Sequence, residues 1–162
     1  MKIHLSNTFV LVFAILFFTG CNSERTHQKT ETAGRTLEYV GTLDFLAPDG
    51  GLLTTIEIAI ADDEPSRSAG LMDVRDLPEN KGMLFLFDDE QPRSFWMAST
   101  PLSLDIIFVN SNREIVRIHR NTQPYSQQNF QSEVPAKYVV EVNAGFTTRY
   151  DITEGVLVDF KL

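Results

Sequence analysis

Large apolar side chains gather in residues 82–110, a stretch that also holds the single tryptophan of the chain. Residues 83–87 form a short, continuous apolar run bounded by polar residues, a pattern typical of a buried strand. After an acidic loop at residues 88–90, two more strands are predicted, at residues 94–98 and 104–109. The central stretch is therefore expected to supply three strands of the core.

A charge interrupts the apolar pattern of the last of these strands. Side chains alternate between the two faces of a strand, and in residues 104–109 every position on both faces is apolar except Asp105. A carboxylate in such surroundings needs a charged partner or a hydrogen-bond network, because an unpaired buried charge is costly. Asp105 is expected to have one of the two.

The segments on either side of the central stretch alternate in the same way. Residues 37–46 and 52–60 are strands joined by a Pro-Asp-Gly-Gly turn, which predicts a hairpin. An aspartate cap, acidic residues and an early proline mark residues 62–72 as the one clear helix start. Downstream, the pattern predicts a strand at 113–120, a long polar loop at 121–135, a strand at 137–143, one or two helical turns at 144–150 and a last strand at 156–160. About eight strands with one or two short helices indicate a mainly β fold, a single-domain β sandwich or partly closed barrel.

Several of these segments carry motifs that together resemble one prokaryotic family. The motifs are F-W-M, a small polar residue and threonine, then L-D-I-I-F, within residues 95–108; G-M-L-F-L-F at 82–87; Arg67, Gly70-Leu71-Met72 and Arg75; and residues 138–142, Ala144-Gly145, Ile152 and Gly155. In this order they resemble the family known as domain of unknown function 192 (DUF192), over roughly residues 53–162. Ser99 stands where the family often has asparagine, and residues 124–135 lack a cysteine pair found in some relatives. The resemblance implies a mainly β fold and no particular reaction.

The N-terminal residues have the pattern of an export signal. Residues 1–20 carry one lysine, Lys2, followed by an apolar segment that is short for a membrane span. They end in a sequence that resembles the bacterial lipobox, directly before Cys21. Cys21 is the only cysteine of the chain, so no internal disulfide can form, and lipidation explains a lone cysteine at this place. The alternative is an ordinary signal peptide with a chance cysteine. Residues 21–36 are polar and are predicted to be a flexible tether, which leaves residues 37–162 as the folded domain.

Charge narrows the classes of partner. Removal of 20 of the 162 residues leaves 142, and the formal net charge changes from −8 to −9 because Lys2 is lost. This length suits one domain, and its acidity disfavours nucleic acid and anionic membrane surfaces as partners. We expect an exported lipoprotein held to the membrane by acyl chains on Cys21, at the periplasmic face or in the outer membrane if the host has one.

The sequence contains no catalytic set of a known kind. Nucleophile-elbow, P-loop and dinucleotide-binding glycine patterns are absent, and the folded domain has no thiol. His119 is the only histidine of that domain, so a multi-histidine metal site is excluded, and neither a metal nor a cofactor is predicted. His119 could serve as a general base, although a satisfied surface or core histidine is the favoured interpretation. Met72, Met83 and Met97 could form a soft pocket or a copper(I) site, with ordinary core packing favoured.

The candidate ligand-binding residues come from the family-like motifs: Arg67, Arg75, Trp96, Thr100 and Asp105. Two interpretations of them stay open. In the structural one, Arg67 and Asp105 form a buried ion pair that fixes the helix on the sheet, and Trp96 belongs to the core. In the functional one, Trp96 is a stacking platform, an arginine clamps a carboxylate or sugar hydroxyls, and Asp105 accepts hydrogen bonds.

Two functions of different class follow. The first is a non-enzymatic ligand-binding or interaction module at the cell envelope, with a glycan or a small molecule as ligand. The second is a hydrolase acting on envelope glycan or peptide, which needs a second carboxylate roughly 5 to 9.5 Å from Asp105. Glu57 and Glu141 are the strand carboxylates available for that role.

Overall fold

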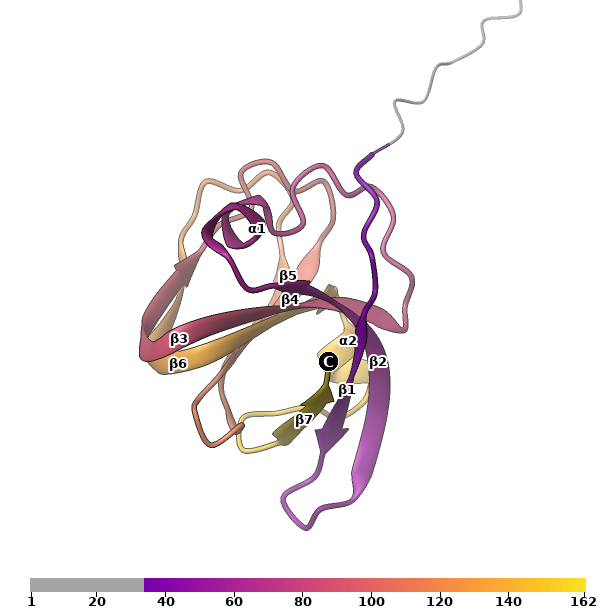
Figure 1. Ribbon diagram of the computed structural model, residues 1–162, viewed down its shortest axis with the longest axis vertical. Helices are drawn as coiled ribbons and strands as arrows, with labels where there is room; N and C mark the ends of the chain where they lie inside the picture. The colour runs from indigo at the N-terminus through magenta and orange to yellow at the C-terminus, as the bar shows by residue number, and fades with distance from the viewer. Residues whose placement is uncertain (1–33) are drawn as a thin grey trace, which may run out of the picture. The chain divides into compact units, whose positions relative to one another are not determined.

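Residues 34–162 are described by a computed structural model, drawn as a ribbon in Figure 1. The elements in chain order are β1 (Gly41–Leu46), β2 (Leu52–Ala61), α1 (Glu64–Ala69), β3 (Lys81–Phe95), β4 (Leu104–Val109), β5 (Ile115–Thr122), β6 (Phe130–Asn143), α2 (Phe146–Arg149) and β7 (Leu157–Lys161). The predicted signal, the predicted lipidation site Cys21 and most of the predicted tether lie outside the described residues.

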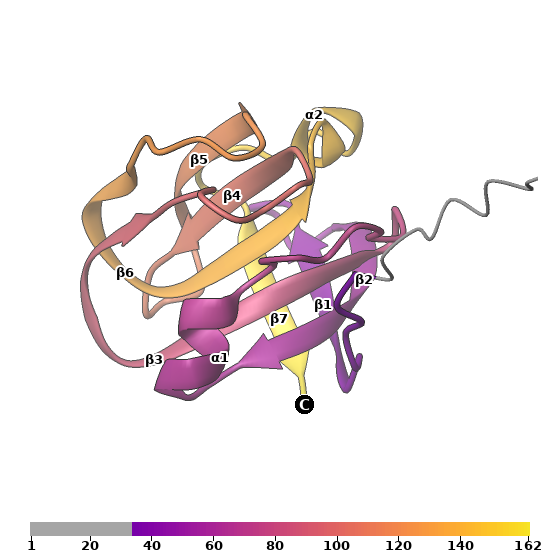
Figure 2. The same cartoon turned by 90° about the horizontal axis from the view of Figure 1, so that it is seen from above.

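The strands form one seven-stranded sheet in the order β5-β4-β6-β3-β2-β1-β7. β2 and β3 are parallel neighbours connected through α1, whereas the other neighbours are antiparallel. The sheet curls until its edge strands meet, where the Ile115 amide donates to the Val156 carbonyl (2.9 Å) and Glu114 forms an isolated bridge with Leu157. Figures 1 and 2 show this curl from two directions. The mainly β fold and the partly closed barrel with two short helices are therefore confirmed, with seven strands in place of about eight.

Apolar side chains cover both faces of the curled sheet. Phe45 and Ile107 belong to an inner layer, to which strands all round the barrel contribute. Phe85 and Phe108 belong to a second layer on the outer face, together with Leu71 from the segment that follows α1. All six residues of β4 are buried, because this strand carries apolar layers on both sides.

Helix α1 begins where the sequence predicts a helix start. The Asp63 carboxylate accepts a hydrogen bond from the Ser66 amide (2.8 Å), and the Ser66 hydroxyl accepts one from the Asp63 amide (3.1 Å), which makes a capping box. Pro65 lies in the first turn, where its missing amide proton costs little. The helix ends at Gly70, whose φ of 43° disfavours any residue with a side chain. Figure 2 shows α1 beside β3, and α2 at the end of β6.

The segment after residue 87 differs from its prediction. β3 continues through the acidic residues 88–90, which were expected to form a loop, and ends at Phe95. No separate strand forms at residues 94–98. Pairing with β6 extends beyond the core as a ribbon whose register shifts twice, and residues 88–92 are exposed there. An exposed ribbon tolerates charges and proline, which explains why its composition resembles that of a loop.

The prediction of a long loop at residues 121–135 is wrong, because much of this segment belongs to the same ribbon. β5 continues to Thr122 and β6 begins at Phe130, so the connection between them is only residues 123–129. Pro92 of β3 and Pro135 of β6 face each other in the register, at an exposed place where the lost amide donors are tolerated. Proline and glutamine content alone therefore misplaced the start of β6.

Candidate functional site

A cavity of about 250 Å³ lies on the outer face of the barrel, between α1 and β3. The first wall is α1 with the turn that follows it, including Arg67 and Met72. Aromatic residues of β3 form the opposite wall, and Trp96 and Thr100 line the cavity from the segment after β3. Glu141 of β6 contributes the last part of the lining. Elements far apart in the sequence therefore meet around one space.

Aromatic rings make up much of this cavity. The rings of Phe85 and Phe95 meet edge to face with their centroids 4.9 Å apart, and the guanidinium of Arg67 lies 5.3 Å from the centroid of the Phe87 ring. Trp96 lines the cavity with 55% of its surface exposed. The interpretation of Trp96 as a core residue is wrong, because it follows directly after the end of β3 and more than half of its surface is exposed.

Arg67 is held by α1 and β3. Its Nη1 donates to the carbonyl oxygens of Asp62 (2.7 Å) and Leu86 (3.0 Å), and its Nη2 lies 3.6 Å from a carboxylate oxygen of Glu64. These contacts fix the helix against the strand and leave the guanidinium partly open to the cavity. The predicted ion pair between Arg67 and Asp105 does not form.

Asp105 is fully buried on the inner face of the sheet. Its Oδ1 accepts hydrogen bonds from the amides of Asn121 (2.8 Å) and Gly145 (3.2 Å), and its Oδ2 accepts from the amide (3.0 Å) and the hydroxyl (2.7 Å) of Thr147. The predicted need for a hydrogen-bond network is therefore confirmed. Asp105 ties α2 and the end of β5 to β4, and it does not line the cavity.

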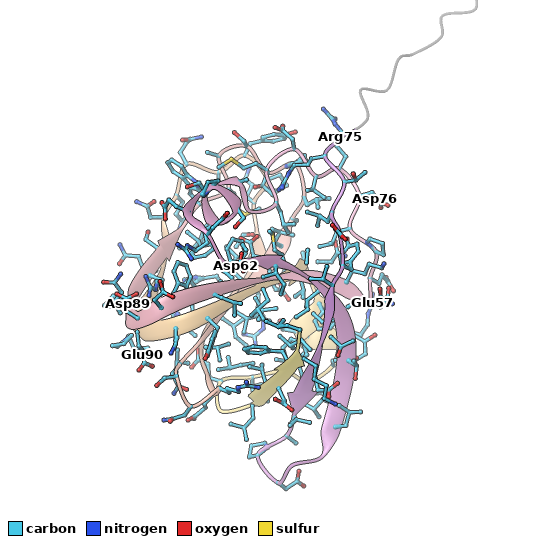
Figure 3. The ribbon with its side chains drawn as sticks, viewed as in Figure 1. Glu57, Asp62, Arg75, Asp76, Asp89 and Glu90 are labelled. Carbon is cyan, nitrogen blue, oxygen red and sulfur yellow. The ribbon has the colours of Figure 1, made fainter. Side chains whose placement is uncertain are left out.

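The structure brings together three of the five predicted ligand-binding residues. Arg67, Trp96 and Thr100 line the cavity, and Thr100 is buried. Arg75 is exposed on the loop between α1 and β3, where its side chain lies against Gly34. Figure 3 shows Arg75 at the periphery of the described residues. Arg75 and Asp105 therefore belong to other parts of the molecule than the cavity.

The sequence suggests Glu141 only as a second carboxylate for Asp105. In the register of the sheet it lies between Met83 of β3 and Ile106 of β4, so it shares the outer face with those apolar residues. It is 4% exposed, and burial raises its pKa from 4.5 to about 8. Glu141 is thus a protonated acid at neutral pH, and it lines the cavity.

The carboxylate pair required for the predicted hydrolase does not form. Asp105 is opposite Val142 in the register and therefore points to the face away from that of Glu141. Glu57 lies on β2, where it forms an ion pair with Lys81 (3.3 Å), and Figure 3 shows it at the far side of the molecule from the acidic end of the ribbon. Neither nominated glutamate faces Asp105.

The other residues that the sequence suggested as functional, His119 and the methionines Met83 and Met97, are packed within the fold. The Nε2 of His119 lies 2.7 Å from the carbonyl oxygen of Gln131, and its ring packs edge-on against Phe108 and Phe130. Met83 and Met97 are buried in the outer apolar layer. Within residues 34–162, no three His, Cys, Asp or Glu side chains gather as a metal site, and no helix has the length and hydropathy needed to cross a membrane.

Comparison with known proteins agrees with this fold. Residues 46–160 match the family model DUF192, described as "Uncharacterized ACR". A crystal structure from Sinorhizobium meliloti 1021, described as a proposed transcription regulator, is 31% identical with a TM-score of 0.72, covering 78% of this chain and 98% of its own. A protein of unknown function from Novosphingobium aromaticivorans DSM 12444 is 29% identical with a TM-score of 0.71, covering 76% of this chain and 86% of its own. No curated protein matches.

Proposed function

Because the chain belongs to the DUF192 family, for which no reaction is established, we propose its function from the cavity: a non-enzymatic module that binds a small organic ligand between α1 and β3. The observation that carries this proposal is a space of about 250 Å³ that combines an aromatic wall with a few polar groups. Binding sites for small molecules have this composition.

The size of the cavity limits the ligand. Pockets for drug-sized molecules typically measure roughly 300 to 1,000 Å³. A space of about 250 Å³ suits a smaller molecule, of the size of an amino acid or a monosaccharide. The exposed ring of Trp96 offers a flat apolar surface for stacking, and Arg67 and Thr100 offer hydrogen bonds.

Binding is favoured over hydrolysis by the state of the polar groups. Arg67 already donates to two carbonyl oxygens and pairs with Glu64. Asp105 is engaged on the opposite face of the sheet. The carboxylate pair that hydrolysis would need does not form, because Glu141 and Asp105 point to opposite faces of the sheet.

The location is part of the same proposal. The signal pattern and Cys21 support an exported lipoprotein, and the polar segment after Cys21 would let the domain reach about 20 Å from the membrane. We do not propose DNA binding for this chain, although the similar Sinorhizobium meliloti protein is described as a proposed transcription regulator. A net charge of −8 opposes binding to the phosphate backbone of nucleic acids.

A ligand screen tests the binding function. Trp96 is the only tryptophan, so intrinsic fluorescence reports directly on the cavity. We expect at least one member of a panel of amino acids, monosaccharides and small amines to change the emission and to raise the Tm. The Tm shift should be lost in Trp96→Ala and retained in Tyr125→Ala, a matched exposed aromatic that does not line the cavity. Equal Tm shifts in the two variants, or none with any compound, would contradict the proposal.

A further inference from the structure

Glu141 is the one ionisable group of the cavity lining that has no partner in residues 34–162. Within that part of the chain no hydrogen bond or charge acts on its carboxyl group, and the residue is only 4% exposed. Buried polar groups are normally paired, because burial without a partner costs free energy. Glu141 lies among apolar neighbours and its side chain lines a cavity. This position indicates a role in binding a ligand, because without a partner the carboxyl group does not stabilise the fold.

The charges near Glu141 are few. The charged residues of the cavity lining are Glu64 and Arg67 of α1, which pair with each other at 3.6 Å. Its neighbours in the register on β3 and β4 are Met83 and Ile106, which are apolar. Burial is the sole cause of its raised pKa, so no described charge acts on Glu141 appreciably. The carboxyl group is thus free to pair with a charge that a ligand supplies.

The complement of this arrangement is a cation. An ammonium group would bring the positive charge and hydrogen-bond donors that a Glu141 carboxylate lacks. The surrounding rings of Phe85, Phe87, Phe95 and Trp96 present faces or edges to the same space, and aromatic faces attract cations. The net charge of −8 also draws cations toward the protein at long range.

We propose that Glu141 is the ligand-recognition residue of this cavity and that the ligand is a small amine, whose ammonium group pairs with the Glu141 carboxylate while its apolar part packs against the aromatic wall. This inference rests on the proposed binding function and specifies its ligand class. On binding, the carboxyl proton of Glu141 passes to solvent and the ammonium keeps its own. Affinity for the amine should therefore rise by up to about tenfold for each pH unit between pH 6 and 8.

Three probes of similar size and different charge separate the possibilities: 2-phenylethylamine, 2-phenylethanol and 3-phenylpropionate. Each is titrated into the full chain, read by Trp96 fluorescence and by calorimetry at pH 6, 7 and 8. We expect the amine to bind best, with release of up to one proton at pH 7, measured in buffers of different ionisation enthalpy. The alcohol should bind more weakly and release no proton.

Variants then assign the effect to Glu141. Glu141→Gln keeps the shape of the side chain, so we expect it to fold and to lose about tenfold or more in amine affinity, with alcohol affinity unchanged. Glu154→Gln, an exposed matched control, should behave as the wild type. Proton release on amine binding is measured with the wild type, so it tests the proposal even if Glu141→Gln fails to fold.

The outcomes distinguish the role of Glu141 in amine recognition from the binding function of the cavity. Tighter binding of the alcohol or the carboxylate than of the amine, or amine binding without proton release, would overturn the assignment of Glu141 and leave a binding cavity. Unchanged amine affinity in Glu141→Gln would do the same. No binding of any probe at millimolar concentration would overturn the amine inference, whereas the binding function itself fails only if the wider panel of amino acids, monosaccharides and amines gives no Tm shift either.

Discussion

Glu141→Gln should stabilise the protein at alkaline pH, and the size of that gain follows from the burial of one carboxyl group. The pKa of Glu141 is about 8 in the folded state and 4.5 as the ordinary value that applies to the unfolded chain. Each pH unit across this interval is worth about 1.4 kcal/mol, so the group disfavours folding by about 5 kcal/mol once the pH exceeds 8.

The direction follows from which state loses the proton first. As the pH rises above 4.5, the unfolded chain ionises while the folded protein keeps its proton, so the free energy of unfolding falls. The fall continues to about pH 8, where the folded state ionises too. By pH 7 the loss amounts to about 3 kcal/mol relative to a pH well below 4.5. Glutamine has no such proton, so Glu141→Gln removes this term.

Urea unfolding at pH 5, 7 and 9 measures the effect. We expect Glu141→Gln and the wild type to agree within about 1 kcal/mol at pH 5, and the variant to be more stable by about 5 kcal/mol at pH 9. Glu154→Gln, at an exposed position, controls for the loss of a surface charge and should follow the wild type. If wild type and Glu141→Gln change in parallel from pH 5 to pH 9, Glu141 is not a buried acid, and the basis for its role in the cavity is lost.

Three further predictions concern other parts of the chain. Trp96→Ala should cost less than about 1 kcal/mol in chemical denaturation, because more than half of the residue is exposed; a loss of 3 to 5 kcal/mol, on the order of a core truncation, would place the ring in the core. Asp105→Ala should cost about 3 to 5 kcal/mol, because the amides of Asn121, Gly145 and Thr147 and the Thr147 hydroxyl lose their acceptor. Its effect should add to that of Arg67→Met within about 0.5 kcal/mol, and coupling above about 2 kcal/mol would restore the ion pair. Cys21→Ser should leave the precursor unprocessed or release the domain from the membrane fraction, and unchanged fractionation of that variant would refute lipidation.

Local signals predicted the elements that local chemistry determines. The turn between β1 and β2 and the Asp63 cap of α1 could be found from sequence, because a few adjacent residues specify each of them. The β3 and β6 ribbon could not, because its strand character comes from pairing between segments some forty residues apart, at exposed positions beyond the core. A segment of charged residues and prolines gives no local sign of such pairing.

The candidate site was predictable in part for the same reason. Motif residues pointed to Arg67, Trp96 and Thr100, which do meet at the cavity. The sequence nominates Glu141 only as a partner for Asp105. Its place in the cavity could not be predicted, because it depends on how the chain crosses from β2 through α1 to β3. Asp105 was misassigned because its donors, in Asn121, Gly145 and Thr147, are backbone amides and one hydroxyl, which no sequence pattern announces.

The most direct test of the binding cavity is a crystal structure of the full domain with 2-phenylethylamine at pH 8. We expect the amine between α1 and β3, its nitrogen about 2.7 to 2.9 Å from a carboxylate oxygen of Glu141 and its ring against Trp96. An empty cavity at saturating amine, or an amine bound with its nitrogen turned away from Glu141, would contradict this expectation.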